Sequence, residues 1–127
     1  NVVFHGHVDH VRVPEYLWEA DVLLLPPSRN HPSARWTSPV KLGEYMAAQR
    51  PMVLSDIPAL RYWVKEDQGF FFKADDPISL AAAIEDCLSR RDARDEMIQS
   101  ASLRAKEWSF ASRAQRILDV SLNKIWR

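Results

Sequence analysis

Apolar residues in the first part of the chain gather in short uninterrupted runs rather than alternating with polar ones. These runs lie at Val2–His5, Val22–Leu25, Met52–Ser55 and Phe70–Phe72. Continuous apolar character is typical of strands that are covered on both faces, because neither face of such a strand meets water. The pattern therefore predicts a buried parallel sheet.

Helical spacing and helix-start signals fill the segments between these runs. The expected helices span Pro14–Ala20, Val40–Ala48 and Ala59–Val64, and longer ones follow at Pro77–Ser89, 92–107 and 110–126. Asp75 and Asp76 precede the helix that opens at Pro77, which places negative charge where the helix dipole favours it. Strands that alternate with helices predict an α/β fold, a Rossmann-like parallel sheet layered by helices, with trailing C-terminal helices.

Composition narrows the functional classes. The chain has 127 residues, enough for one domain with one core. Lys plus Arg and Asp plus Glu number 17 each, so no long-range field attracts nucleic acid or an anionic membrane. The apolar run at Val22–Leu25 is far too short to span a bilayer. We expect a soluble domain that does not bind nucleic acid.

The single cysteine and the histidines do not predict a metal centre or a disulfide. Cys87 lies among Ala, Ile and Leu in a helical pattern, which favours a buried apolar role and a reducing, cytoplasmic location. His5, His7 and His10 with Asp9 carry metal-ligating groups, but no second cluster of ligands lies elsewhere in the sequence, apart from the isolated His31. We interpret them as solvated loop histidines beside a ligand, and we expect no metal and no cofactor.

The segment from Thr37 to Ala48 is the most informative part of the sequence. Thr37-Ser38-Pro39 is a helix-start signal that follows a predicted buried strand. The first backbone N–H groups of a helix are unpaired and carry partial positive charge, so they hold phosphate well. Glu44 lies one turn further along, where its carboxylate can accept hydrogen bonds from sugar hydroxyls. This combination predicts a site for a nucleoside-diphosphate sugar.

The order of the motifs also resembles a known family. The motifs are Val3-x-x-Gly6-x-Val8, Glu19-Ala20-Asp21-Val22-Leu23-Leu24-Leu25-Pro26, Ser38-Pro39-Val40-Lys41-Leu42-Gly43-Glu44-Tyr45-Met46-Ala47 and Arg50-Pro51-Met52-Val53-Leu54-Ser55-Asp56-Ile57-Pro58. In this order they resemble the C-terminal, nucleotide-sugar-binding half of retaining glycosyltransferases of the GT-B fold, the group 1 or family 4-like enzymes. The resemblance covers residues 1 to about 120. It implies that residues 1–127 form one domain, a fragment of a longer protein whose N-terminal GT-B domain is missing here.

The resemblance also implies a function and its residues. The family transfers a hexose from a UDP-, GDP- or ADP-sugar to an acceptor hydroxyl with retention, usually without a metal at the diphosphate. Gly6 and His7 match a turn near the nucleobase, and Glu44 matches the glutamate that holds the ribose hydroxyls. The residues that surround the diphosphate-binding helix start are Thr37, Ser38, Val40 and Lys41. Ser55 and Asp56 end a strand at the carboxyl edge of the sheet, where open α/β sheets bind ligands.

Trp36 departs from the family pattern. It stands where the family has its first glutamate, a residue beside the donor sugar, so the catalytic residue of this chain stays unknown at this point. We interpret Trp36 as a wall of the sugar pocket, at the end of a polar loop that spans Ser28 to Arg35. Two alternatives stay open: a non-catalytic binding or interaction module and a GT-B sugar-nucleotide epimerase. A receiver-type domain is disfavoured because Asp56 stands alone at its strand end.

The last helices carry aromatic residues that a small domain does not need, Trp108, Phe110 and Trp126. One interpretation is that they close the domain's own core; another is that they cover an absent partner domain. Self-association through exposed apolar surface is a further expectation. Membrane docking ranks below these because basic and acidic residues balance around the rings. Peripheral association of the full-length protein with the inner membrane stays open beside the cytoplasmic location.

Overall fold

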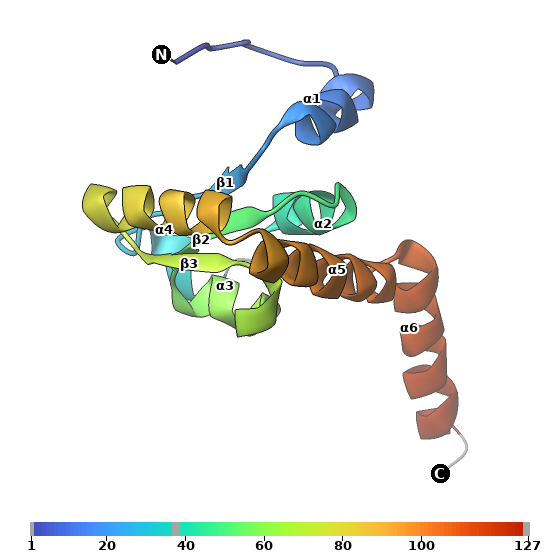
Figure 1. Cartoon of the computed structure of the whole chain (residues 1–127). Coiled ribbons are helices and arrows are strands. Elements are labelled where there is room, and N and C mark those ends of the chain that lie inside the picture. Colours follow the sequence, from blue (N-terminus) through green and yellow to red (C-terminus); the bar gives the residue numbers. More distant parts are fainter. Residues whose placement is uncertain (1, 37–38, 126–127) are drawn as a thin grey trace.

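The structure is a computed structural model that describes residues 2–36 and 39–125, without the side chains of residues 123–125. Its centre is a parallel sheet of three strands in the order β1, β2, β3 (Figure 1). The strands span Leu23–Leu25, Met52–Asp56 and Phe70–Lys73. The predicted α/β fold with a parallel sheet is therefore confirmed.

Six α-helices precede, cover or follow the sheet, each within one residue of its predicted bounds in the described part of the chain. They are α1 (Val13–Glu19), α2 (Val40–Ala47), α3 (Pro58–Trp63), α4 (Pro77–Ser89), α5 (Arg91–Glu107) and α6 (Phe110–Ile125). Three short 3₁₀ helices were not predicted: η1 (His10–Arg12), η2 (Pro32–Arg35) and η3 (Glu66–Gln68). The Asp76 carboxylate caps α4 by accepting hydrogen bonds from the amides of Ile78 and Ser79, as the acidic start predicted.

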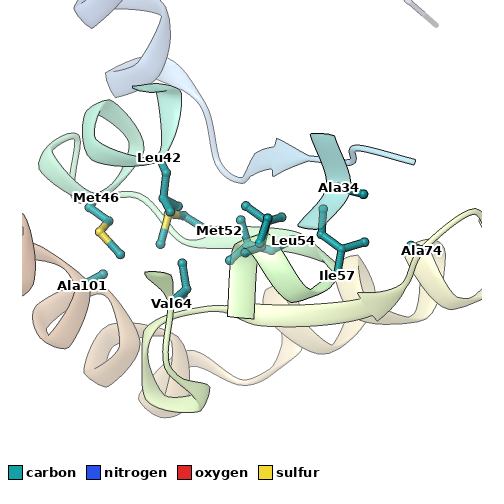
Figure 2. Close-up of a cluster of buried hydrophobic side chains, with 11 residues drawn as sticks. Ala34, Leu42, Met46, Met52, Leu54, Ile57, Val64, Ala74 and Ala101 are labelled. Atoms are coloured by element: carbon teal, nitrogen blue, oxygen red, sulfur yellow. The ribbon is translucent and has the colours of Figure 1, made fainter. Parts of the chain in front are cut away.

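Alternate residues of β2 face two separate apolar layers, as a pleated strand requires. On one face, Met52 and Leu54 pack with α2, α3, η2 and Ala101 of α5 (Figure 2). On the other face, Val53 packs with Phe70, Phe72 and residues of α4. Coverage on both faces explains why β2 shows no alternation in the sequence.

Helix α2 connects this core to the surface. Its Leu42 and Met46 side chains are fully buried in the first layer, and its Val40 side chain is exposed. The helix ends at Ala47, and Gln49 then adopts a left-handed backbone with a φ of 55°. Glycine is the usual residue after such a helix end, so this chain carries a backbone strain there that a glycine would relieve.

Two predictions about the first part of the chain are wrong. Residues Val2–His5 form no strand: Val2, Val3 and Phe4 are exposed, and within the described residues no strand pairs with them. A run of apolar residues becomes a strand only when a neighbouring strand accepts its hydrogen bonds. The segment Ser28–Arg35 is not a loop throughout, because Pro32–Arg35 form η2, which buries Ala34 in the first core layer.

The terminal helices divide into a packed part and an exposed part. The Trp108 ring stacks edge-on against Trp63, with ring centroids 5.2 Å apart, and joins the first core layer. Helix α6 then extends away from the sheet (Figure 1), and its Phe110, Ile117 and Leu118 side chains are exposed. Trp108 therefore closes the domain's own core and Phe110 does not, while Trp126 lies outside the described residues.

Candidate functional site

The start of α2 is open to solvent. Pro39 is its N-cap residue in an extended conformation, and no side chain of the described residues caps the first amides. The first turn contains no acidic residue, and Lys41 is exposed. The Leu42 amide donates to the carbonyl oxygen of Pro39 at 3.0 Å. Among the described residues, the amides of Val40 and Lys41, together with the lysine side chain, therefore remain to offer hydrogen-bond donors and positive charge to an anion.

Glu44 faces a hollow between α2 and the preceding helices, which we call the α1 hollow. This hollow has a volume of about 250 Å³. Its residues come from η1, α1 and α2, and they are His10, Val13, Pro14, Leu17, Trp18, Glu44, Ala47 and Ala48. The walls are therefore mostly apolar, and Glu44 contributes the only carboxylate among the residues that line it.

A second hollow lies on the other side of the α2 start, and we call it the α6 hollow. Pro39, Val40 and Gly43 line it from α2, opposite Trp63, Trp108 and the exposed face of α6. Val40 and Glu44 are four residues apart, so they lie on the same stripe of the helix, about one turn from each other. The structure thus places Val40 and Glu44 one turn apart on α2, where they line different hollows.

The other predicted site residues are only partly brought together. Gly6 has a positive φ of 67°, as a tight turn requires, but Gly6 and His7 are exposed and line neither hollow. Trp36 is 85% exposed, which excludes a core role, and it lines neither hollow. Thr37 and Ser38 lie outside the described residues.

Charged side chains at the carboxyl edge of the sheet pair with one another. Arg61 donates two hydrogen bonds to the Asp56 carboxylate, at 2.7 and 2.9 Å, and also pairs with Glu66. Its guanidinium lies 3.6 Å from the centre of the Phe71 ring. These hydrogen bonds and the positive charge of Arg61 hold the pKa of Asp56 below its usual range. Asp56 is therefore committed to Arg61.

Ser55, the other residue predicted at this edge, is fully buried. Its relative exposure is 1%, and its Oγ atom has no hydrogen-bond partner among the described residues. Its β3 neighbour in register is Phe72, so the hydroxyl lies in the apolar layer under α4. Ser55 is placed as a core residue rather than as a ligand contact.

Two further ion pairs lie at the same edge. The Arg29 side chain donates to the carbonyl oxygen of Ala74 at 2.8 Å and pairs with Asp75, whose carboxylate also accepts a hydrogen bond from the Arg29 amide. Lys73 pairs with Asp76 at 3.3 Å. These contacts tie the segment after β1 to the end of β3, and they occupy the cations that a phosphate at this edge would need.

The other residues that could carry chemistry have structural roles in the fold. Cys87 is fully buried in the layer under α4, and burial raises the pKa of its thiol, as expected for an apolar core residue. The Asp9 carboxylate caps η1 through the Val11 amide, and the His5 ring packs edge-on against Tyr16.

Among the described residues, no three of His, Cys, Asp and Glu gather as a metal site. No described helix is long and apolar enough to cross a membrane.

Sequence reasoning missed the α1 wall of the hollow. The sequence pattern places His10 among several loop histidines and does not single out Leu17 and Trp18. The signal was nevertheless present, because Pro14, Leu17 and Trp18 recur at helical spacing and so form one apolar stripe on α1. What the sequence lacked was the direction of that stripe, which faces α2 and not the sheet.

Comparison with known proteins identifies the family of the chain. Residues 1–90 match the family model described as glycosyl transferases group 1. A protein of Bacillus subtilis (strain 168), named a putative teichuronic acid biosynthesis glycosyltransferase, TuaH, is 27% identical over 110 residues. The alignment covers 86% of this chain and 28% of that relative. The chain therefore spans little more than a quarter of the length of the relative.

Proposed function

Because this chain belongs to the group 1 glycosyltransferases, we propose that it is the donor-binding half of an enzyme that transfers a hexose with retention. The donor is a nucleoside-diphosphate sugar with uracil, guanine or adenine as its base, and the acceptor is a hydroxyl group. In this proposal an N-terminal GT-B domain supplies the acceptor pocket, and no metal ion assists at the diphosphate. The full-length protein works in the cytoplasm.

One observation carries the proposal: Glu44 lies one turn beyond the start of α2, on the same stripe as the exposed Val40, and no side chain of the described residues caps the first amides there. One turn is about 5.4 Å of helix rise. That spacing is comparable with the separation between the ring hydroxyls and the 5′-phosphate of a ribose. A nucleotide can therefore place its hydroxyls on Glu44 and its diphosphate on the α2 amides at the same time.

The chemistry requires stabilisation of a leaving diphosphate. The bond between the anomeric carbon and the diphosphate oxygen breaks, and the acceptor oxygen bonds to that carbon on the same face. The acceptor proton leaves on a diphosphate oxygen. The free amides of α2 and the Lys41 ammonium group hold the negative charge that develops, which is the role of preorganised donors in such reactions.

Trp36 supplies shape rather than charge in this proposal. Its indole is 85% exposed and directly precedes the segment that leads into α2, so it is available as a wall for the sugar ring. The family has its first glutamate at the position of Trp36, where this chain has no carboxylate. We therefore assign Glu44 to donor binding and not to proton transfer.

Calorimetric titration of this chain with UDP, GDP and ADP tests the proposal. We expect weak binding of at least one of these nucleotides, and weaker binding after Glu44→Gln. The heat should be unchanged when the metal chelator EDTA is present. An absence of heat from all three nucleotides at millimolar concentration, with a folded protein, would contradict it.

A further inference from the structure

The exposed helix α6 (Phe110–Ile125) carries an inference about a partner other than a nucleotide. We propose that α6 lies along the surface of an anionic lipid bilayer, with its apolar side chains in the acyl boundary and its arginines against the headgroup phosphates. Neither Glu44 nor the free amides of α2 take part in this contact. The inference therefore stands independently of the proposed function.

Helix α6 has an apolar face that the rest of the described chain leaves uncovered. Phe110, Ala114, Ile117 and Leu118 recur at the spacing of one helix face, and Leu122 continues it by one turn; we call these residues the α6 stripe. All five side chains are exposed, and the helix extends away from the sheet (Figure 1). Helices in proteins gain most of their stability when such a face packs against another surface. The α6 stripe is therefore open to a partner outside the described residues.

The charge of this segment differs from that of the whole chain. The chain as a whole has 17 basic and 17 acidic residues, but residues 110–127 contain Arg113, Arg116, Lys124 and Arg127 against Asp119 alone. Four positive charges and one negative charge leave a net charge of +3 on this segment. Salt limits the reach of a charge to about 8 Å, so a surface that contacts α6 meets this local charge and not the total. Basic and acidic residues do not balance here, so the reason for placing membrane docking below the other partners fails.

The arginines at the described positions of α6 are free of acidic partners within the described residues. Arg116 donates to the backbone carbonyl oxygen of Glu107 at 3.0 Å, and neither Arg113 nor Arg116 forms an ion pair there. Five other arginines each pair with a carboxylate, namely Arg12, Arg29, Arg61, Arg90 and Arg94. An arginine without a carboxylate can donate paired hydrogen bonds to a phosphate. Lipid headgroups supply such phosphates.

The α6 hollow extends this apolar and basic surface towards α2. Its volume is about 830 Å³, and Trp63 and Trp108 line it together with Ile117 of the α6 stripe. Arg113 and Arg116 are the only charged residues among those that line it, so it contains no carboxylate. An apolar opening bordered by two cations is complementary to a lipid, which joins an acyl chain to an anionic headgroup. The hollow and the α6 stripe therefore favour the same partner.

Charge also distinguishes a bilayer from a second copy of this chain. Two copies of α6 packed along their stripes would bring together two segments that each carry a net charge of +3, which repel each other. An anionic bilayer instead attracts every basic residue near its surface, and each one strengthens binding about fivefold. A helix with one apolar face and a basic polar face is typical of segments that lie in the plane of the membrane surface. The bilayer is therefore the partner that suits both faces of α6.

Flotation of the chain with lipid vesicles tests the inference. One set of vesicles contains equal parts of phosphatidylcholine and phosphatidylglycerol, and the other contains phosphatidylcholine alone. We expect binding to the anionic vesicles to be at least about tenfold tighter than to the neutral ones, and to weaken as salt is added. No binding to the anionic vesicles, or equal binding to both sets, would overturn the inference.

Matched variants locate the contact on α6. Leu118→Glu should reduce binding to anionic vesicles at least about tenfold, whereas Ile78→Glu, at an exposed apolar residue of α4, should not. Arg113→Gln and Arg116→Gln in one chain should reduce binding about twentyfold, and Arg91→Gln on α5 should leave it unchanged. These side chains are exposed, so each variant should fold, which circular dichroism checks. Undiminished binding of the α6 variants would overturn the inference.

Sedimentation velocity without lipid tests the second copy as the alternative occupant. We expect the parent chain to sediment as a monomer. A dimer that Leu118→Glu dissociates would assign the α6 stripe to a second copy and would overturn the inference.

A fluorescent probe on α6 reports the orientation of the helix independently of its affinity. Ile117→Cys and Gln115→Cys are each labelled with an environment-sensitive dye, while Cys87 is fully buried and stays unlabelled. Residues 115 and 117 lie on nearly opposite sides of the helix. Anionic vesicles should shift the dye emission to shorter wavelength at position 117 and not at position 115. Equal shifts at both positions, or none at either, would contradict a helix that lies with its stripe in the bilayer.

Discussion

Two apolar regions meet at α2 and differ in how completely they are filled. On one side, Leu42 and Met46 enter a core layer in which Met52 and Leu54 are almost wholly buried. On the other side, Glu44 and Ala47 border a hollow of about 250 Å³ whose far wall is the apolar stripe of α1. Close packing stabilises a fold, whereas an apolar space that stays open and includes a carboxylate is suited to a ligand. We therefore assign stability to the first region and propose binding for the second.

The largest expected effect concerns the filled side. Leu54→Ala removes a fully buried side chain from the centre of β2 and leaves a cavity. We expect it to lower the free energy of unfolding by about 2–5 kcal/mol, as measured by urea denaturation. Leu118→Ala is the matched control, since Leu118 is 54% exposed on α6. Its effect should stay within about 0.5 kcal/mol; equal effects of the two variants would show that the core is not where we place it.

The next effect concerns the open side. Glu44→Gln keeps the size of the side chain but removes its charge, so in the proposed complex it weakens the hydrogen bonds that the ribose hydroxyls donate. We expect a loss of nucleotide affinity of about 1.5–3 kcal/mol, measured by calorimetry, with little change in unfolding free energy. Glu85→Gln, on the exposed side of α4, serves as the control. A loss of the same size in both variants would indicate a general charge effect and not a site.

A third effect tests whether the buried polar group of the filled region has a hydrogen-bond partner. Ser55 buries a hydroxyl without a partner among the described residues, and such a group costs free energy. Ser55→Ala should therefore raise the free energy of unfolding by about 1 kcal/mol. Thermal or urea denaturation measures the change. A marked loss of stability would mean that the hydroxyl has a partner, for example an ordered water molecule.

The smallest effect is a dependence of stability on pH. Hydrogen bonds from Arg61 lower the folded-state pKa of Asp56 below its unfolded value of about 3.9. The stabilisation is therefore present above about pH 4 and is lost as the pH falls through the lowered pKa. Because the Asp56 side chain is 48% exposed, we expect less than about 1 kcal/mol. The difference in unfolding free energy between the parent chain and Asp56→Asn should be positive at pH 7 and vanish near pH 2.

Much of the filled region could be predicted from the sequence. The strands at Leu23–Leu25, Met52–Asp56 and Phe70–Lys73 are apolar on both faces, and Pro and Asp mark the helix starts, so local signals agree with the final packing. The strand expected at Val2–His5 failed because strand formation depends on a neighbour, which local sequence does not contain. Apolar character alone cannot distinguish a central strand from an exposed extended segment.

The open region could be predicted only in part. Glu44 followed from its distance to the helix start, which is a local relation. His10 and Trp18 did not, because their contact with the same hollow depends on how α1 lies against α2. Gly6 and His7 came from the family resemblance, and the structure does not place them in the hollow.

Nuclear magnetic resonance mapping of nucleotide binding tests the central claim most directly. Backbone amide signals of the ¹⁵N-labelled chain are followed while UDP, GDP or ADP is added. We predict that the largest shifts fall on residues 10–18 and 40–48, the two walls of the α1 hollow and the start of α2. Largest shifts at Asp56 and Lys73–Asp76, at the carboxyl edge of β2 and β3, or the absence of any shift, would contradict it.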